Sequence, residues 1–292
     1  MRLGVLLIPT DPWPATVARA RHLESLGFHH LWTYDHLSWQ RYRDDPWHAA
    51  IPWLTGIAAT TSRIRLGTMV TSPNFRHPVT LAKDVMTLDH ISAGRATLGL
   101  GAGGTGFDAS VLGQPPLSPG QRVARLGDFI EIVDGLLTNS EFSTDNNRYP
   151  VHEARMVPGC VQQPRVPLAI AAAGPKTIAL AARFGDAWVT VGHPRDREPT
   201  AASVETAVRA QSRLLEERCA ELGRDPQSLD RIFLVSNRVE RPLRSLPTFR
   251  DFLYRYEALG ITDLVLHDPR PDDSFWDDDP AILEAVAEEF LT

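Results

Sequence analysis

The sequence predicts a single (β/α)₈ barrel, an α/β fold in which eight parallel strands alternate with eight helices. Three observations lead to this prediction. Short β-rich runs alternate with longer helical patterns along nearly the whole chain, eight such pairs can be counted, and no linker rich in glycine or serine interrupts the 292 residues. A doubly wound open sheet is the alternative, but such a sheet seldom needs eight units of this regularity. We therefore expect one domain over residues 1–292.

The predicted elements follow one another in strict order. The strands are expected at residues 3–8, 30–34, 64–70, 96–101, 167–171, 187–191, 232–237 and 263–267. The helices are expected at residues 15–26, 49–61, 79–91, 121–137, 177–183, 201–222, 248–259 and 280–290. The fourth helix shows the pattern well, because Leu126, Phe129, Ile130 and Val133 recur at helical spacing and form one apolar stripe.

The longest irregular stretches are expected to be excursions from the barrel. They follow the fourth strand, at residues 105–120, and the eighth strand, at residues 268–279. Residues 138–155 predict a small hairpin, and the acidic run at 272–279 is interpreted as a solvated loop. In a barrel of this kind the loops that follow the strands line one face, where catalytic groups collect.

The composition favours a soluble cytoplasmic protein that acts on a small molecule. The formal net charge of −6 argues against nucleic-acid binding, which needs a basic face. Cys160 and Cys219 form neither a metal-type spacing nor a disulfide framework, which suits a reducing compartment. The first apolar run ends at Pro9, too short to span a membrane and without a cleavage site after it.

The most informative stretch is LWTYDHLSW, residues 31–39, where an apolar strand ends abruptly at Asp35 and His36. A carboxylate and an imidazole at this end of a strand can hold a proton near neutral pH or bind a polar cofactor ring. Trp39 adds a flat apolar surface nearby. The alternative is that His36 is an ordinary loop residue and that Asp35 caps a turn, and strand position alone leaves both interpretations open.

Two further loops follow predicted strands. The loop after the third strand carries Arg76 and His77, which can meet an anion or can simply be solvated. The stretch GLGAGGTGF, residues 99–107, resembles a dinucleotide-binding fingerprint, but no helix opens directly after it, so we reject that interpretation. What remains is a glycine-rich lip that allows backbone to approach a flat ligand closely.

A phosphate subsite is predicted at the ends of the fifth and sixth strands. AIAAAGPKT, residues 169–177, places Gly174 and Pro175 at the start of a helix, whose free N–H groups attract an anion, and Lys176 adds charge. TVGHP, residues 190–194, brings small residues to the same face. A pair of tight turns is the simpler alternative.

Other chemistries lack support in the sequence. No HExxH and no clustered histidines occur at strand ends, and His29 with His30 precedes the second strand, on the opposite face, so we expect no metal site. No serine or cysteine lies in a nucleophile-elbow pattern, which argues against acyl transfer.

Three blocks together resemble the luciferase-like flavin and deazaflavin oxidoreductases. They are GFHHLWTYDHL, then TSRIRLGTMVTSPNFRHPVTLAKDVMTLDHISAGRATLGLGAGG, then PLAIAAAGPKTIALAARFGDAWVTVG. The resemblance implies a (β/α)₈ barrel and a homodimer. The acid-histidine pair followed by a tryptophan is most similar to the deazaflavin branch, which uses coenzyme F420 and transfers hydride.

The resemblance also implies roles for individual residues. His36 would stabilise the charge formed in hydride transfer, Asp35 would contact the cofactor or orient the histidine, and Trp39 would pack beside the reacting centre. A non-prolyl cis peptide is implied between Met69 and Val70. The implied cofactor contacts are Asp35, Met69, Val70, Ser72, Gly101, Ala102 and Gly103, with the phosphate held by Ala173, Gly174, Pro175, Val191 and Gly192.

One departure from the family pattern bears on the substrate. The sugar-phosphate dehydrogenases of this branch place a glutamate after the fourth strand, where this chain has Gly103 and Gly104, and their phosphate-gripping basic residues have no match. We expect another small organic substrate, contacted from residues 40–47, 105–120 and the loop after the eighth strand. The alternatives are an FMN-dependent monooxygenase and a non-catalytic flavin-binding barrel.

Overall fold

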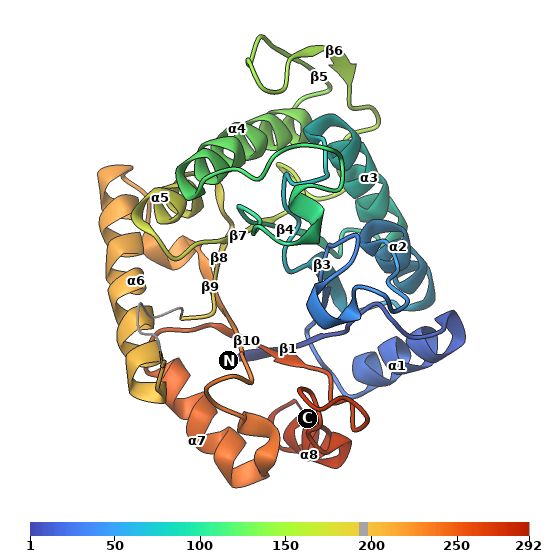
Figure 1. The fold of residues 1–292 in the computed structure, drawn as a ribbon, viewed down its shortest axis with the longest axis vertical. Coiled ribbons are helices and arrows are strands. Elements are labelled where there is room, and N and C mark those ends of the chain that lie inside the picture. The colour runs from blue at the N-terminus through green and yellow to red at the C-terminus, as the bar shows by residue number, and fades with distance from the viewer. Residues whose placement is uncertain (193–197, 292) are drawn as a thin grey trace.

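The computed structural model describes residues 1–192 and 198–291, which include a closed barrel of parallel strands in the order β1-β10-β9-β8-β7-β4-β3-β2 (Figure 1). The predicted barrel is confirmed. Its strands are β1 Arg2–Leu6, β2 His30–Thr33, β3 Arg65–Thr68, β4 Ala96–Leu100, β7 Leu168–Ala171, β8 Ala187–Thr190, β9 Asp230–Leu234 and β10 Asp263–His267. The first and last strands close the ring in register, with Arg2 opposite Asp263 and Leu6 opposite His267.

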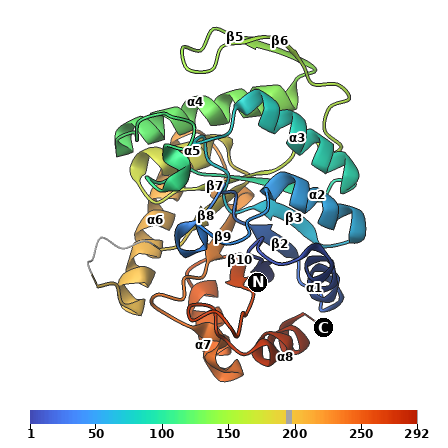
Figure 2. The same cartoon turned by 45° about the vertical axis from the view of Figure 1, so that its right-hand side comes forward.

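Helices cover the outside of the barrel (Figure 2). They are α1 Trp13–Ser25, α2 Ala50–Thr60, α3 Pro78–Ile91, α4 Pro119–Thr138, α5 Pro175–Phe184, α6 Ala201–Glu221, α7 Leu246–Glu257 and α8 Pro280–Phe290. Proline in the first turn starts most of them, because its missing N–H costs nothing there. Within the described ranges, no helix has the length and hydropathy that a membrane crossing requires.

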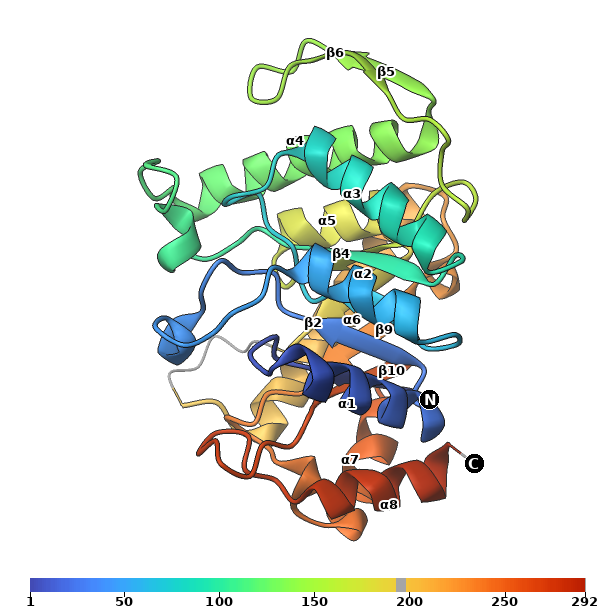
Figure 3. The ribbon, with the colours of Figure 1, turned by 90° about the vertical axis from the view of Figure 1, so that its right-hand side faces the viewer.

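Two short strands lie outside the barrel and confirm the hairpin predicted for residues 138–155. They are β5 Glu141–Thr144 and β6 Val151–Arg155, which pair antiparallel. The hairpin is inserted between α4 and β7 and projects beyond α4 at one end of the molecule (Figure 3). Four 3₁₀ turns are also described, at η1 Gln40–Tyr42, η2 Phe107–Ala109, η3 Pro226–Ser228 and η4 Pro242–Arg244.

Trp32 fills the inside of the barrel and is 1% exposed. A Cβ atom on Gly67 of the neighbouring strand would lie 2.3 Å from the Trp32 ring. The absence of a side chain at Gly67 therefore makes room for the indole. A separate apolar layer, which includes Leu126, Phe129 and Val133 of α4, packs between the strands and the helices.

Gly99 and Gly101, at the end of β4, make room for the neighbouring strand, and the expected approach of this glycine-rich stretch to a ligand stays a prediction. β3 is interrupted at the Met69–Val70 peptide bond, which is cis, as the family resemblance implies. The chain then pairs with β4 again, since Thr71 N donates to the Gly99 carbonyl at 2.8 Å. A Cβ atom on Gly99 would lie 1.8 Å from the Thr68 carbonyl oxygen, and one on Gly101 would lie 2.5 Å from the Val70 side chain.

Gly99→Ala is therefore expected to lower the free energy of unfolding by about 3 kcal/mol, because the new methyl group meets a backbone oxygen that cannot move aside. Gly106→Ala is the matched control in the same segment, since a Cβ atom there has nothing within 4 Å. That variant should stay within about 0.5 kcal/mol of the parent protein. Urea unfolding of the three proteins gives the comparison, and equal stabilities would contradict the packing role of Gly99.

Candidate active site

The loops after β2 and β3 are joined by a buried ion pair. Arg76 donates to Asp35 through Nη2 at 2.6 Å and through Nε at 3.0 Å, and the Thr71 hydroxyl donates to the same carboxylate at 2.8 Å. Asp35 is 1% exposed. The bidentate Arg76 guanidinium thus compensates the charge of Asp35, and this geometry stabilises a buried carboxylate.

His36 is held by a residue of a third loop. Its Nδ1 is hydrogen-bonded to Asp108, which lies in η2 after β4, and the other oxygen of that carboxylate accepts from Leu37 N at 2.9 Å. A carboxylate oxygen only accepts hydrogen bonds, so Nδ1 carries the hydrogen. Among the residues that the structure describes, none is hydrogen-bonded to Nε2 of His36, and this nitrogen is left to act as an acceptor.

Aromatic rings surround His36. Its imidazole stacks on Trp39 with ring centres 6.0 Å apart and 19° between the planes, and it meets the edge of Trp47 at 6.2 Å. Trp39 in turn lies 4.7 Å from the Tyr34 ring. The side chain of His36 is 28% exposed, so the ring is neither sealed in the core nor directed freely into solvent. This arrangement limits water around the imidazole while leaving it accessible.

A second histidine lies at the end of β10. His267 Nε2 is 2.7 Å from the Tyr34 hydroxyl, and its ring stacks on Trp276 at 3.6 Å. Burial lowers the pKa of His267 to about 3 and raises the pKa of Tyr34 above its usual value. Both side chains are therefore uncharged at neutral pH.

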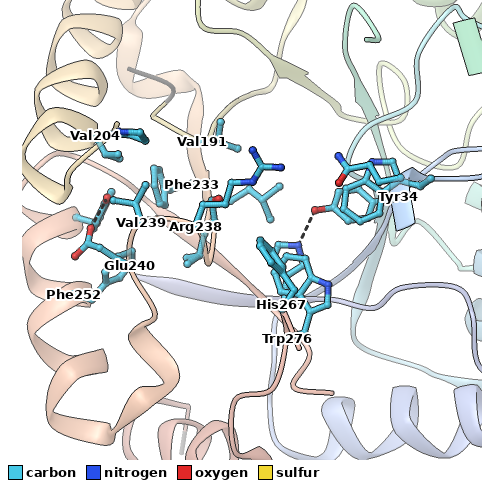
Figure 4. A pocket seen from close by; sticks show the side chains of 18 residues that line it. Tyr34, Val191, Val204, Phe233, Arg238, Val239, Glu240, Phe252, His267 and Trp276 are labelled. Atoms are coloured by element: carbon cyan, nitrogen blue, oxygen red, sulfur yellow. Dashed lines mark hydrogen bonds between the residues drawn. The ribbon is translucent and has the colours of Figure 1, made fainter. Parts of the chain in front are cut away.

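A cavity of about 540 Å³ opens on the β8–β9–β10 side of the barrel mouth (Figure 4). Its walls come from the ends of β2, β8, β9 and β10 and from α6 and α7. Of the residues predicted from sequence, Trp39 and Val191 line it. A cavity of this size is in the usual range for small-molecule sites.

The predicted residues of β3 and β4 lie at the same mouth. Met69 and Ser72 are buried and Val70 is half-buried. The Gly101 N–H is used within the sheet, since it donates to the Thr71 carbonyl at 2.9 Å. Ala102 and Gly103 are half-buried, and Gly103 adopts a φ of +71° against the Asn74 side chain. The contact of these residues with a cofactor stays a prediction.

The predicted phosphate subsite stays a prediction, and its residues differ in exposure. Gly174 is the N-cap of α5, and a Cβ atom there would meet nothing within 4 Å. Ala173, Pro175 and Lys176 are exposed beside it. The structure shows Val191 exposed and Gly192 buried.

Gly192 adopts a φ of +59°, and a Cβ atom would lie 2.6 Å from Val204 of α6. Its conformation and the close helix both require glycine. His193 and Pro194 of the TVGHP stretch lie outside the described residues.

Two expectations are corrected by these contacts. The side chain that orients the His36 ring is Asp108, while the Asp35 carboxylate accepts from Arg76 and Thr71, and the expected contact of Asp35 with a cofactor stays a prediction. The anion that Arg76 meets belongs to the chain itself, and the neighbouring His77 caps α3 by accepting from Val79 N at 3.3 Å.

The acidic run at 272–279 is not simply a solvated loop. Asp278 is 6% exposed, accepts from Asn237 at 3.0 Å and pairs with Arg241 at 2.9 Å, while Trp276 packs on His267. The acidic side chain of Asp278 therefore binds Asn237 and Arg241, which follow β9. These contacts place the aromatic side chain of Trp276 at the barrel mouth.

Several residues of the site carry no local signal in the sequence. Asp108 lies in a stretch interpreted as a loop, Arg238 follows β9 without a motif, and Trp276 is hidden in the acidic run. The predicted strand at 263–267 ends at His267. A polar residue at a strand end is the one sequence signal that could have identified it as part of the site. Over residues 1–192 and 198–291, no three histidine, cysteine or acidic side chains are grouped as metal ligands would be.

The luciferase-like monooxygenase family model matches residues 1–239, and the chain belongs to that family. A relative named F420-dependent glucose-6-phosphate dehydrogenase, from Beutenbergia cavernae, is 29% identical over 92% of this chain and 89% of its own.

Two solved structures share the fold. An F420-dependent secondary alcohol dehydrogenase, in complex with an F420-acetone adduct, superimposes with a TM-score of 0.80 at 19% identity, covering 98% of this chain and 97% of its own. A monooxygenase from Streptomyces bottropensis superimposes with a TM-score of 0.79, also at 19% identity, covering 100% and 99%.

The low pKa of His267 makes a specific pH dependence testable. The imidazole takes up a proton near pH 6.5 in the unfolded chain but only near pH 3 in the folded protein. The unfolded state therefore binds more protons between these values, and the free energy of unfolding falls as the pH drops through this window, by up to about 1.4 kcal/mol per pH unit from this group.

His267→Gln keeps an acceptor for Tyr34 and cannot titrate, so its unfolding free energy should fall less steeply with acid than that of the parent protein. His48→Gln, at an exposed position, is the control and should leave the slope unchanged. Urea unfolding across this pH window measures the slopes. Identical slopes for the parent protein and His267→Gln would contradict the burial of a neutral imidazole.

Proposed function

We propose that this protein is an oxidoreductase that transfers hydride between coenzyme F420 and a small organic substrate. The observation that carries the proposal is His36, fixed through Nδ1 by Asp108 and surrounded by aromatic rings at the barrel mouth. The names of the similar proteins support the same choice, since F420-dependent dehydrogenases appear among both the relatives and the solved structures.

The residues at the mouth fit a flat cofactor with a phosphate-bearing tail. Nothing fills the space that a Cβ atom would occupy at Gly174, whose own N–H donates to the Thr177 hydroxyl at 3.3 Å, so the anion would meet the N–H groups of the first turn of α5. The interrupted end of β3 presents Met69 and Val70 to the same mouth. We expect the tail at Ala173, Gly174, Pro175 and Val191, and the ring near Met69, Val70 and Ser72. When bound, the deazaflavin supplies a ring carbon that accepts or donates hydride.

The residues of the chain then hold or accept a proton, exclude water and fix the position of the histidine. His36 accepts or holds a proton at Nε2, because Asp108 occupies Nδ1. Trp39 and Trp47 keep water away from that imidazole. Asp35 does not move a proton in this scheme. Its pairing with Arg76 fixes the loop from which His36 projects.

The second candidate is an FMN-dependent monooxygenase. The family model carries that activity in its description, and the monooxygenase from Streptomyces bottropensis has the same fold. The same start of α5 would accept the FMN phosphate, so the two candidates differ in the ring and in the use of oxygen. A non-catalytic flavin-binding barrel is the third, and the Asp108–His36 pair, which such a protein does not need, argues against it.

The cofactor can be tested directly by titrating the purified protein with F420 and, separately, with FMN. We expect saturable quenching of F420 fluorescence, with FMN binding at least about tenfold weaker, a difference of about 1.4 kcal/mol. Gly174→Asp, which places a negative charge at the start of α5, should weaken F420 binding by a similar factor. Saturable binding of FMN alone would overturn the proposal in favour of the monooxygenase.

The Asp108–His36 pair predicts a non-additive loss of activity. With F420 and a panel of secondary alcohols, His36→Ala should lower kcat about 100-fold and Asp108→Asn about tenfold, while the Kd for F420 stays within about threefold. Because Asp108 acts through His36, the double variant should be no slower than His36→Ala. Losses that multiply would show that Asp108 has a separate role, and His36→Ala with full turnover would remove the histidine from the mechanism.

A further inference from the structure

The cavity beside the candidate active site is lined mainly by aromatic and aliphatic side chains. Phe233, Phe252 and Tyr256 form its floor and are each at most 2% exposed, and the Phe233 and Tyr256 rings lie 4.2 Å apart. Tyr34 and Trp39 form the wall nearest His36. A surface of this kind binds the apolar part of a ligand.

Among the residues that the structure describes, two charged side chains line the cavity, and only one of them has a partner of opposite charge. Glu240 is paired with Arg255 and accepts from the Tyr256 hydroxyl at 3.4 Å, so its charge is compensated inside the protein. Arg238 has no hydrogen bond or ion pair with any residue of the described part of the chain. Figure 4 shows its side chain extending toward the middle of the cavity, between Val191 and Tyr34 in that view. The cavity thus has an uncompensated positive charge.

The loop that carries Arg238 is anchored on both sides. Asn237 donates to Asp278 at 3.0 Å and to the Phe275 carbonyl at 3.4 Å, and Glu240 is held by Arg255. Arg238 therefore projects from a fixed backbone, while its guanidinium has no partner among the residues that the structure describes. A cation placed in this way at the rim of an apolar cavity is suited to meet an anionic ligand group.

The cavity also adjoins the candidate catalytic histidine. Tyr34 and Trp39 line the cavity, and both rings lie within 6.2 Å of the His36 ring, measured between centres. These two rings therefore lie between the cavity and His36. Arg238 is placed on the opposite, β9 side of the same space.

We propose that this cavity selects the substrate, and that the substrate class is an apolar, preferably aromatic, molecule with one carboxylate that pairs with Arg238. This inference rests on the proposed function, because it assigns the substrate of that site. A carboxylate is favoured over a phosphate because the cavity offers one planar guanidinium, which matches a carboxylate with two parallel hydrogen bonds, and its lining residues in the described part of the chain include no second uncompensated cation.

The test uses the purified protein loaded with F420 and two probes with the same apolar body, 4-phenylbutyrate and its neutral amide, 4-phenylbutanamide. Binding is followed by quenching of tryptophan fluorescence, since Trp39 and Trp276 line the cavity. We expect the carboxylate to bind about tenfold more tightly than the amide. Arg238→Met should remove that difference by weakening only the carboxylate, and Arg238→Lys should restore part of it.

The matched control is Arg209→Met, which removes the same charge from the exposed side of α6 and should change neither affinity. Equal affinity of the parent protein for the two probes, or an unchanged preference in Arg238→Met, would overturn the inference. So would a matching loss of F420 affinity in Arg238→Met, because Arg238 would then serve the cofactor.

If the protein binds no F420 at all, the proposed function fails. The same two probes, applied to the cofactor-free protein, then decide the cavity's preference independently, with the same outcomes supporting or overturning it.

Discussion

The geometry of the site depends on the buried ion pair between Asp35 and Arg76. A carboxylate that is 1% exposed is stable there only because the guanidinium binds both of its oxygens, and removal of either partner would leave an uncompensated charge in the barrel mouth. The pair ties the loop after β2 to the loop after β3. Since His36 directly follows Asp35, the backbone from which the imidazole projects is fixed by a contact that involves no ligand.

A third loop completes this arrangement. Asp108 comes from the short turn after β4 and binds both the His36 ring and the Leu37 N–H. In a closed parallel barrel the carboxyl ends of neighbouring strands meet at one face, which is why residues far apart in the sequence lie together. His36 is thus fixed at two points. Its backbone is held through the neighbouring residues Asp35 and Leu37, and its ring is held through Asp108.

The sequence predicted the features that depend on local pattern. Strand and helix alternation identified the barrel, and β10 and α8 lie where the pattern placed them. The abrupt end of the second strand pointed to His36. The partner of that histidine was not predictable, because Asp108 is 72 positions away and only barrel closure brings the two together. The packing role of Gly99 was not predictable either, because the space beside it is needed by the Thr68 carbonyl of a strand that lies about 30 positions earlier in the sequence.

The two sides of the barrel mouth meet at the hydrogen bond between Tyr34 and His267. Burial lowers the pKa of the histidine to about 3 and raises that of the tyrosine, so neither side chain gains or loses a proton near neutral pH. This uncharged contact therefore lies between His36 on the β2–β4 side and the permanent cation Arg238 on the β9 side. With the roles proposed for His36 and Arg238, proton handling and substrate choice rest on different loops, so a substitution at Arg238 would change which molecule binds while the fixed position of His36 is preserved.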